Sequence, residues 1–436
     1  MKKSVVAVLI ILALVIIVSP GILGGLAEKS VDENVNWAAA QQGDVVVTSN
    51  SFDRGWFSSE GQHRIEAKGG NIAALLVELG EPGEPLPVLV IDTHLDHGLI
   101  PVSSLSRENG SLAPGLGSAV STLSVELGNG EIIEIPGKIY SRASLGGQIE
   151  SSYQVEPGSR SDGHRKAAWG TSSVDLTTNP ASGEIQFAGN IRGIEFSDRS
   201  EAMGIGALTF SGNQSPTKYG FSVGDMTMGL EDLSVSNNGI QALVIRAMSV
   251  DGETLLDGDR VGGRTTMKME FGGLPQFGDV TFSGDISLVG ADAEALGGLT
   301  RTMKALEPNP DPMQTFPSVE GDLKRLLASG LEMRFDQLDV ALPIGTVAMT
   351  MNLRVAEKDP DAFEWTSLLL STEGAARLSV PEALVDMAAA VNPQAGAMIG
   401  MGMLVKSGDV YEMDARLEKG LLTINGAPIP IPMGAF

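Results

Sequence analysis

The chain has 436 residues, of which 42% are hydrophobic, a formal net charge of −24 and no cysteine. Without cysteine it can form no disulfide, no thiolate metal site and no lipid attachment through an N-terminal cysteine. An acidic body repels nucleic acid and anionic headgroups, which basic patches attract, and 5% aromatic residues leave few rings for stacking bases. We therefore expect a solvated acidic surface and no nucleic-acid partner. Capture of a cation or of a basic partner is the alternative.

The first predicted element is an apolar segment at residues 1–27. Lys2 and Lys3 precede it, and no charge follows them until Glu28. A helix needs about 20 apolar residues to cross a bilayer, and cationic side chains stay on the cytoplasmic side. The segment is therefore predicted to be a transmembrane signal-anchor with the body of the protein outside the cytoplasm. A secretory signal cleaved after Ala27 is the alternative, and it places the body on the same side.

Residues 28–42 have helical spacing and predict a short stalk that Gly43 ends. The next β-branched run predicts a first hairpin within residues 44–70, and residues 88–95 predict a strong strand. Between residues 121 and 290, apolar and polar residues alternate with period two, which is typical of strands with one buried face. The 54 glycines of the chain suit many turns. We expect successive antiparallel hairpins that build a long sheet.

The period changes near residue 291. Residues 291–306 and 318–330 predict helices on either side of a proline loop, and strands then return. Two short apolar helices, broken at Asn392 and Pro393, precede a closing hairpin. The expected fold is mainly β (α+β), a long curved antiparallel sheet with a few helices packed on it. It is divided into a transmembrane anchor at 1–27, a stalk helix and antiparallel β domain at 28–290, and a helix-containing β domain at 291–436.

One motif near the start of the predicted sheet is distinctive. It is the turn Arg54-Gly55-Trp56-Phe57-Ser58-Ser59 after a strand, and Asp96-His97-Gly98 and the tail 419–426 follow later. With the apolar segment before them, these landmarks resemble the YdgA-like bacterial family of unknown function over essentially the whole chain. Phe52 replaces the commoner tyrosine, and Leu99 stands where proline is expected. The resemblance implies a β-rich protein anchored in the bacterial inner membrane with its body in the periplasm, and it implies no reaction.

The same turn is a candidate ligand site. Arg54 offers a forked donor, Trp56 a flat apolar face, and Phe57 a second ring beside them. The structural alternative is that both rings pack against the sheet while Arg54 pairs with a carboxylate, because aromatic residues beside a turn usually pack.

Asp92, His94 and Asp96 are weak candidates for a metal site. Alternate residues of a strand share one face, so these three side chains would lie together. A zinc site usually needs at least three strong ligands, and the other histidines would have to come from distant segments. We therefore expect a polar strand face and no cofactor.

Residues 220–224 match the pattern G-x-S-x-G around Ser222. A nucleophile elbow needs a strand before the serine and a helix after it. Because the alternation continues past Ser222, we expect it to lie in or beside a strand, and we expect a protein that is not an enzyme. A hydrolase around Ser222 is the least favoured reading.

A methionine-rich apolar cluster lies late in the chain, with Met398, Met401 and Met403 at its centre and Met387 before it. Methionine adapts to varied apolar partners, so the cluster suits a lipid-contacting groove, while core filling over the sheet is the alternative.

These patterns lead to three hypotheses. The first is an envelope protein that offers an apolar groove to lipid or to a hydrophobic partner, because a sheet that is apolar on one face must have that face covered. The second is a structural or assembly factor that binds other envelope proteins through sheet edges. The third is the enzyme around Ser222 or His94.

Overall fold

The structure, a computed structural model, describes residues 45–54, 58–67, 85–97, 115–274, 277–305 and 312–429. The chain divides into two compact units. The first consists of Met1–Pro216, Ser236–Ile240 and Lys304–Pro310, and the second of Thr217–Val235, Gln241–Met303 and Asp311–Phe436. Residue 290, where the sequence predicts a domain seam, lies inside the second unit.

The predicted mainly β fold, with a large antiparallel sheet and few helices, is confirmed. The predicted transmembrane anchor at 1–27 and stalk helix at 28–42 lie outside the described residues. Among the helices of the described ranges, none has both the length and the apolar character that crossing a membrane requires.

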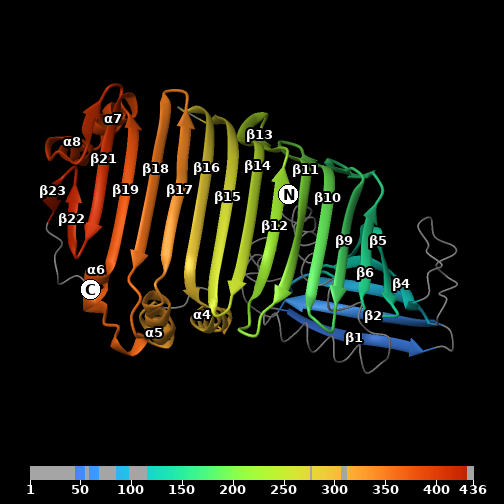
Figure 1. Cartoon of the computed structure of the whole chain (residues 1–436). Coiled ribbons are helices and arrows are strands. Elements are labelled where there is room, and N and C mark those ends of the chain that lie inside the picture. The colour runs from blue at the N-terminus through green and yellow to red at the C-terminus, as the bar shows by residue number, and fades with distance from the viewer. Residues whose placement is uncertain are drawn as a thin grey trace. The chain divides into compact units, whose positions relative to one another are not determined.

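The first unit holds eleven consecutive strands (Figure 1). They are β1 (Val45–Arg54), β2 (Ser58–Ala67), β3 (Val88–His97), β4 (Gly115–Glu126), β5 (Ile132–Ser144), β6 (Ile149–Val155), β7 (Gly158–Asp162), β8 (Arg165–Trp169), β9 (Ser172–Asn179), β10 (Glu184–Asp198) and β11 (Glu201–Pro216). Neighbours from β1 to β6 pair in chain order and antiparallel, as the hairpin prediction requires.

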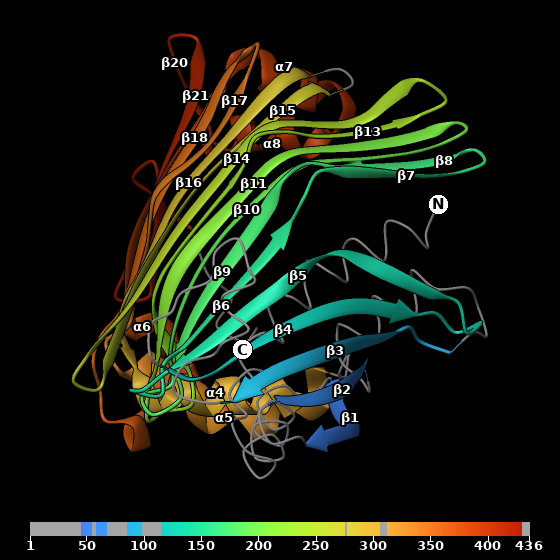
Figure 2. The same cartoon turned by 90° about the vertical axis from the view of Figure 1, so that its right-hand side faces the viewer.

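The β7–β8 hairpin departs from this simple order. β6 pairs with β9, so the hairpin between them is left out of that run. It pairs instead with the far half of β10, where Ala167 lies opposite Phe196, while the near half of β10 pairs with β9. The hairpin therefore extends as an arm, and the sheet of this unit curls so that the arm faces β4 and β5 (Figure 2).

The sheet of the first unit has an apolar inner face. Partners directly opposite each other on paired strands point to the same side. Leu123 lies opposite Ile135, and Tyr153 lies between Ile139 and Val174, so all five side chains share one face. Each of them is buried. The other face of the same strands carries polar and charged side chains, which fits strands with one buried face.

The second unit holds a further set of strands. They are β12 (Ser222–Leu230), β14 (Ile240–Asp257), β15 (Arg260–Leu274), β16 (Gly278–Asp292), β17 (Glu332–Leu342), β18 (Gly345–Val355), β19 (Thr372–Pro381), β20 (Val405–Ser407), β21 (Val410–Glu418), β22 (Leu421–Ile424) and β23 (Ala427–Ile429), with β13 (Leu233–Asn237) between β12 and β14 in the chain. From β14 to β19 each strand pairs antiparallel with the next, and β19 then pairs with β21.

Helices pack at one end of the strands of the second unit (Figure 1). They are α4 (Ala293–Ala305) and α5 (Pro312–Ala328), with the short α6 (Leu368–Ser371) and the 3₁₀ turns η2 (Pro360–Ala362) and η3 (Trp365–Ser367) nearby. Val261 and Ala291 of the sheet are buried against Ala293 of α4, and Ala328 of α5 is buried with Val355 and Phe363.

The last two helices, α7 (Glu382–Val391) and α8 (Pro393–Gly400), meet at the predicted break. The Asn392 side chain accepts a hydrogen bond from the Gln394 N–H at 3.0 Å, and Pro393 takes the first helical position. Asparagine suits a helix N-cap, and proline has no N–H to leave unsatisfied there.

Candidate functional site

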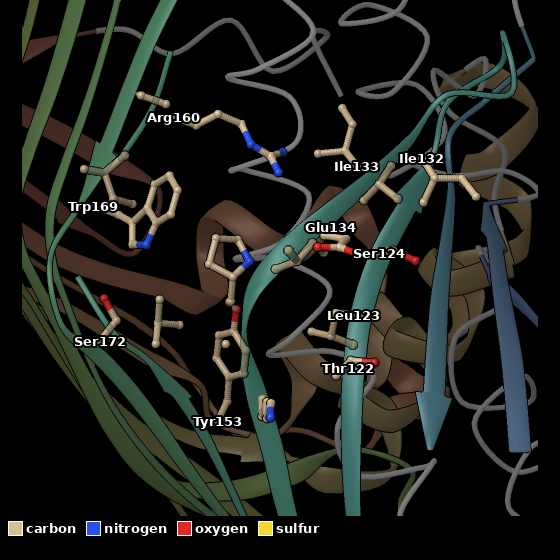
Figure 3. Close-up of a pocket in the computed structure, with 18 of the residues that line it drawn as sticks. Thr122, Leu123, Ser124, Ile132, Ile133, Glu134, Tyr153, Arg160, Trp169 and Ser172 are labelled. Atoms are coloured by element: carbon tan, nitrogen blue, oxygen red, sulfur yellow. Dashed lines mark hydrogen bonds between the residues drawn. The ribbon is translucent and has the colours of Figure 1, made fainter. Parts of the chain in front are cut away.

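A pocket of about 1140 Å³ lies between two walls of the first unit. One wall is formed by β4 and β5, which β6 and β9 continue, and the other by β7, β8 and the far half of β10 (Figure 2, Figure 3). Ligand sites for small molecules are typically concave, mostly apolar and of about 300–1,000 Å³. This pocket is therefore large enough for an extended ligand.

The wall formed by β4 and β5 presents its apolar inner face to the pocket. Leu123 and Thr122 are neighbours on β4, and Figure 3 shows them pointing to opposite sides, with Leu123 toward the pocket. On β5, the side chain of Ile133 is half-buried while that of Ile132 is 65% exposed. Alternation along each strand thus separates an apolar inner surface from a polar outer one.

A β-bulge shapes the floor of the pocket at Pro136 and Gly137. Register with β4 shifts in this region, and Gly137 has a φ of 104°, which is accessible to glycine at little cost. The Tyr153 hydroxyl of β6 donates a hydrogen bond to the Pro136 carbonyl oxygen at 2.5 Å. Burial raises the pKa of Tyr153 to about 12, so its ring stays neutral at any ordinary pH.

The opposite wall is built around Trp169 on β8. Its indole Nε1–H donates to the Glu156 carbonyl oxygen at 3.1 Å. The ring covers Gly158 of β7, where an added Cβ would come within 2.9 Å of the indole. Phe196 of β10 is buried on the same side, because it lies opposite Ala167 in the register with β8. The wall therefore offers the pocket one large aromatic surface held by close backbone packing.

Most charged groups around the pocket are in ion pairs or lie on the outer face. Arg64 pairs with Glu126 at 2.7 Å on the outer face, which raises the pKa of Arg64 and lowers that of Glu126. Arg165 lies 3.4 Å from Asp198. Arg160 on β7 is different, because its guanidinium extends over the pocket toward Ile133 (Figure 3).

The turn motif predicted as a ligand site is described only in part. Arg54 ends β1 and lies opposite Ser59 of β2, so the predicted first hairpin is confirmed. Trp56, Phe57 and the side chain of Arg54 lie outside the described residues, and their proposed contact with a ligand stays a prediction.

Asp92, His94 and Asp96 lie on β3 as predicted, on the outer face of the sheet. His94 is flanked by two carboxylates, with Nδ1 3.7 Å from Glu60 and Nε2 3.4 Å from Asp96. Asp92 accepts a hydrogen bond from Gln62 at 2.8 Å. The two imidazole nitrogens face different carboxylates, so the lone pairs do not converge, and within the described ranges no three metal-ligating side chains group together.

Ser222 is the first residue of β12 and is exposed. The strand that follows it leaves no room for the helix that a nucleophile elbow requires. The sequence-based expectation that Ser222 lies in a strand is therefore confirmed.

The methionine cluster is partly exposed. Met398 and Met403 are half-buried and their backbones are linked, since the Met403 N–H donates to the Met398 carbonyl oxygen at 2.9 Å. Met401 is 64% exposed and Met387 46% exposed. These four side chains therefore do not form one buried core, and their contact with lipid stays a prediction.

Sequence reasoning did not single out the residues that line the pocket. Arg160, Trp169 and Tyr153 belong to no motif, and each is one position in an alternating strand. The one local signal is the pair Pro136-Gly137, which interrupts the alternation of β5 and is typical of a bulge. Which strands face each other across the pocket follows only from the pairing of β8 with β10.

Fold and site together define a mainly β protein whose curled antiparallel sheet encloses a large apolar pocket. The chain belongs to the family described as bacterial protein of unknown function (DUF945), which matches residues 1–432. It is similar to Protein YdgA of Escherichia coli (strain K12), with 24% identity over 282 residues, 59% of this chain and 53% of that protein. The chain thus aligns with about half the length of this curated relative. The predicted family is confirmed, and no solved structure matches the chain.

Proposed function

We propose that the pocket of the first unit binds the acyl chain of a lipid. The observation that carries this proposal is the largely apolar surface formed by the inner faces of β4, β5, β6 and β9 and by the Trp169 wall opposite. Removing apolar surface from water is favourable by roughly 25 cal/mol per Å², so a bound apolar chain is stabilised by the part of this lining that still contacts water. The volume of about 1140 Å³ and the strand-built walls suit an extended acyl chain.

The second part of the proposal concerns location. We propose that the apolar segment at residues 1–27 anchors the protein in the bacterial inner membrane, with its body in the periplasm. Two lysines before the segment and a charge-free run up to Glu28 support this orientation. An anchor in the membrane would hold the pocket close to the lipids that it is proposed to bind.

Binding is tested by quenching of Trp169. The chain has four tryptophans, and replacing Trp37, Trp56 and Trp365 by phenylalanine leaves Trp169 as the reporter. The full chain is kept in amphipol and titrated with dibrominated stearate and with its methyl ester, because bromine quenches indole only on contact. We expect saturable quenching by the brominated chain.

Two apolar residues of the first unit supply matched variants. Ile133→Asp places a carboxylate on the inner face of β5, while Leu145→Asp places the same group in the turn after β5, where Leu145 is 56% exposed and lies outside the pocket lining. We expect Ile133→Asp to weaken quenching about tenfold or more, because a carboxylate against an acyl chain is unfavourable and this one would lie beside Arg160, the cation that extends toward position 133. We expect Leu145→Asp to bind like the parent. No quenching by either probe, or equal quenching in both variants, would overturn the proposal.

Location is tested by cysteine labelling, which the absence of native cysteine makes free of background. Ala181 is exposed in the turn between β9 and β10. We expect Ala181→Cys to react with a membrane-impermeant maleimide in intact spheroplasts. Reaction only after lysis would place the body in the cytoplasm and contradict the proposal. The mass of the purified chain then separates an intact anchor from cleavage after Ala27.

Native mass spectrometry of the detergent-extracted chain separates lipid binding from the assembly-factor hypothesis. We expect mass additions in the range of single lipids. Co-purification of other envelope proteins with no lipid on the chain would favour the assembly factor instead.

A further inference from the structure

The inner face of the first unit carries one cation that no described acidic side chain neutralises. Register shows which side chains of the β7–β8 hairpin share a face, because Gly158 lies opposite Trp169 and Arg160 lies opposite Ala167. Arg160 therefore shares a face with Trp169, whereas Lys166 lies opposite Ser161 and points to the other side. Figure 3 shows the same arrangement, with the Arg160 guanidinium over the pocket and directed toward Ile133.

The other charged residues around the pocket do not compete for this role. Arg165 shares the face of Arg160 but is paired with Asp198. Lys138 and Glu134 also line the pocket, but they alternate with the inward-facing Ile139 and Ile135 and therefore belong to the outer face of β5. Glu131 is exposed in the connection between β4 and β5, where its N–H donates to the Asn129 side chain at 2.9 Å. Among the described side chains, Arg160 alone brings unneutralised charge to the inward face of the β7–β8 arm.

We propose that Arg160 binds the anionic headgroup of the lipid, and hence that the pocket selects amphiphiles that end in a carboxylate or a phosphate. This inference rests on the proposed binding of an acyl chain. A guanidinium presents parallel N–H donors that match the two oxygens of such a group. The chain would lie along the apolar inner face, and the headgroup would lie at Arg160, whose guanidinium is directed toward Ile133.

The inference refines an expectation from composition. A body with a net charge of −24 repels anionic headgroups in general. This repulsion is the sum of many surface charges, and at ordinary salt concentrations ions screen each of them beyond about 10 Å. A single arginine that faces an apolar surface acts at contact distance, so anion binding at this one point is compatible with an acidic body.

The two bromine probes separate headgroup selection from chain binding. They share one brominated chain, and only the free acid carries a negative charge. In the Trp169 reporter chain we expect the acid to quench at about tenfold lower concentration than the methyl ester, as charge-assisted hydrogen bonds predict. Arg160→Gln is expected to remove this preference by weakening the acid alone. Arg354→Gln, which removes an exposed charge from the second unit, is expected to leave it unchanged.

Each outcome bears on one proposal. Equal affinity for acid and ester in the parent, or an unchanged preference in Arg160→Gln, would overturn headgroup selection while chain binding stands. Quenching by neither probe would overturn chain binding itself. Inorganic phosphate is expected to leave the thermal midpoint unchanged. Stabilisation by phosphate equal to that by dibromostearate would mean that Arg160 holds a free anion and would also overturn the inference.

Discussion

The Tyr153 hydroxyl of β6 donates a hydrogen bond of 2.5 Å to the carbonyl oxygen of Pro136 on β5. The Pro136-Gly137 bulge takes this carbonyl out of the regular ladder, and Tyr153 is only 8% exposed. A buried carbonyl without a partner is unfavourable, so the tyrosine stabilises the bulge that shapes the pocket floor.

Tyr153→Phe is expected to lower the free energy of unfolding by about 1–2 kcal/mol, because it leaves the carbonyl oxygen of the half-buried Pro136 without a donor. Urea denaturation followed by circular dichroism measures the loss. Tyr411→Phe, at a half-buried position in the second unit, serves as the control for removing a hydroxyl. A variant as stable as the parent would show that water satisfies the carbonyl equally well.

The same residue predicts a pH dependence at the alkaline end. Burial raises the pKa of Tyr153 to about 12 in the folded protein, above its ordinary value near 10. Below pH 10 the ring is neutral in both states and stability is fully present. Between pH 10 and 12 the unfolded chain ionises first, so stability falls by about 1.4 kcal/mol per pH unit. We expect the difference in stability between parent and Tyr153→Phe to shrink over this range, and parallel pH profiles would contradict the shift.

Gly137→Ala is expected to destabilise the first unit by about 2–4 kcal/mol. Gly137 has a φ of 104°, and a Cβ there would come within 2.5 Å of the Gln154 carbonyl oxygen, which belongs to the backbone and cannot rotate away. Gly130→Ala is the matched control, because Gly130 has a φ of 83° but meets nothing within 4 Å. Denaturation of both variants separates the backbone strain from the close approach. Equal losses would show that only the strain matters.

Asp292 is expected to stabilise α4 in two ways. Its carboxylate accepts a hydrogen bond from the Ala295 N–H at 2.8 Å, as an N-cap does, and lies 3.0 Å from Arg325 Nε. Asp292→Ala removes both contacts and should cost about 1–2 kcal/mol. Asp292→Asn keeps the cap and removes the ion pair, so we expect a smaller loss, since partly exposed ion pairs contribute little. Thermal unfolding of the two variants tests this order, and equal losses would assign the stability to the ion pair.

Much of the fold follows from local patterns. The strand predicted at 88–95 is β3, and the helix predicted at 291–306 is α4. The break predicted at Asn392 separates α7 from α8. These predictions succeed because side-chain periodicity and capping depend on residues a few positions apart. The placement of the β7–β8 hairpin on β10 is different, since nothing in the hairpin itself identifies its partner.

The residues of the candidate site could not be predicted from local patterns in the same way. Trp56 and the methionines stand out by composition, whereas the pocket is lined by Tyr153, Trp169 and Arg160. Alternation indicates that Trp169 and Ala167 share a face, but it does not indicate whether that face meets solvent or another wall. Only the curl of the sheet brings the two walls together (Figure 2).

The amino-acid sequence by itself determined the family, the antiparallel β character and the residues that alternate between two faces, because each of these depends on residue type and short spacing. The tertiary structure alone decided that β8 pairs with β10, that Trp169 faces Leu123 across a pocket, and that Arg160 extends over it toward Ile133. The physical reason is that strand pairing is a long-range choice. It is settled by burial of the whole apolar face, and no short segment contains that information.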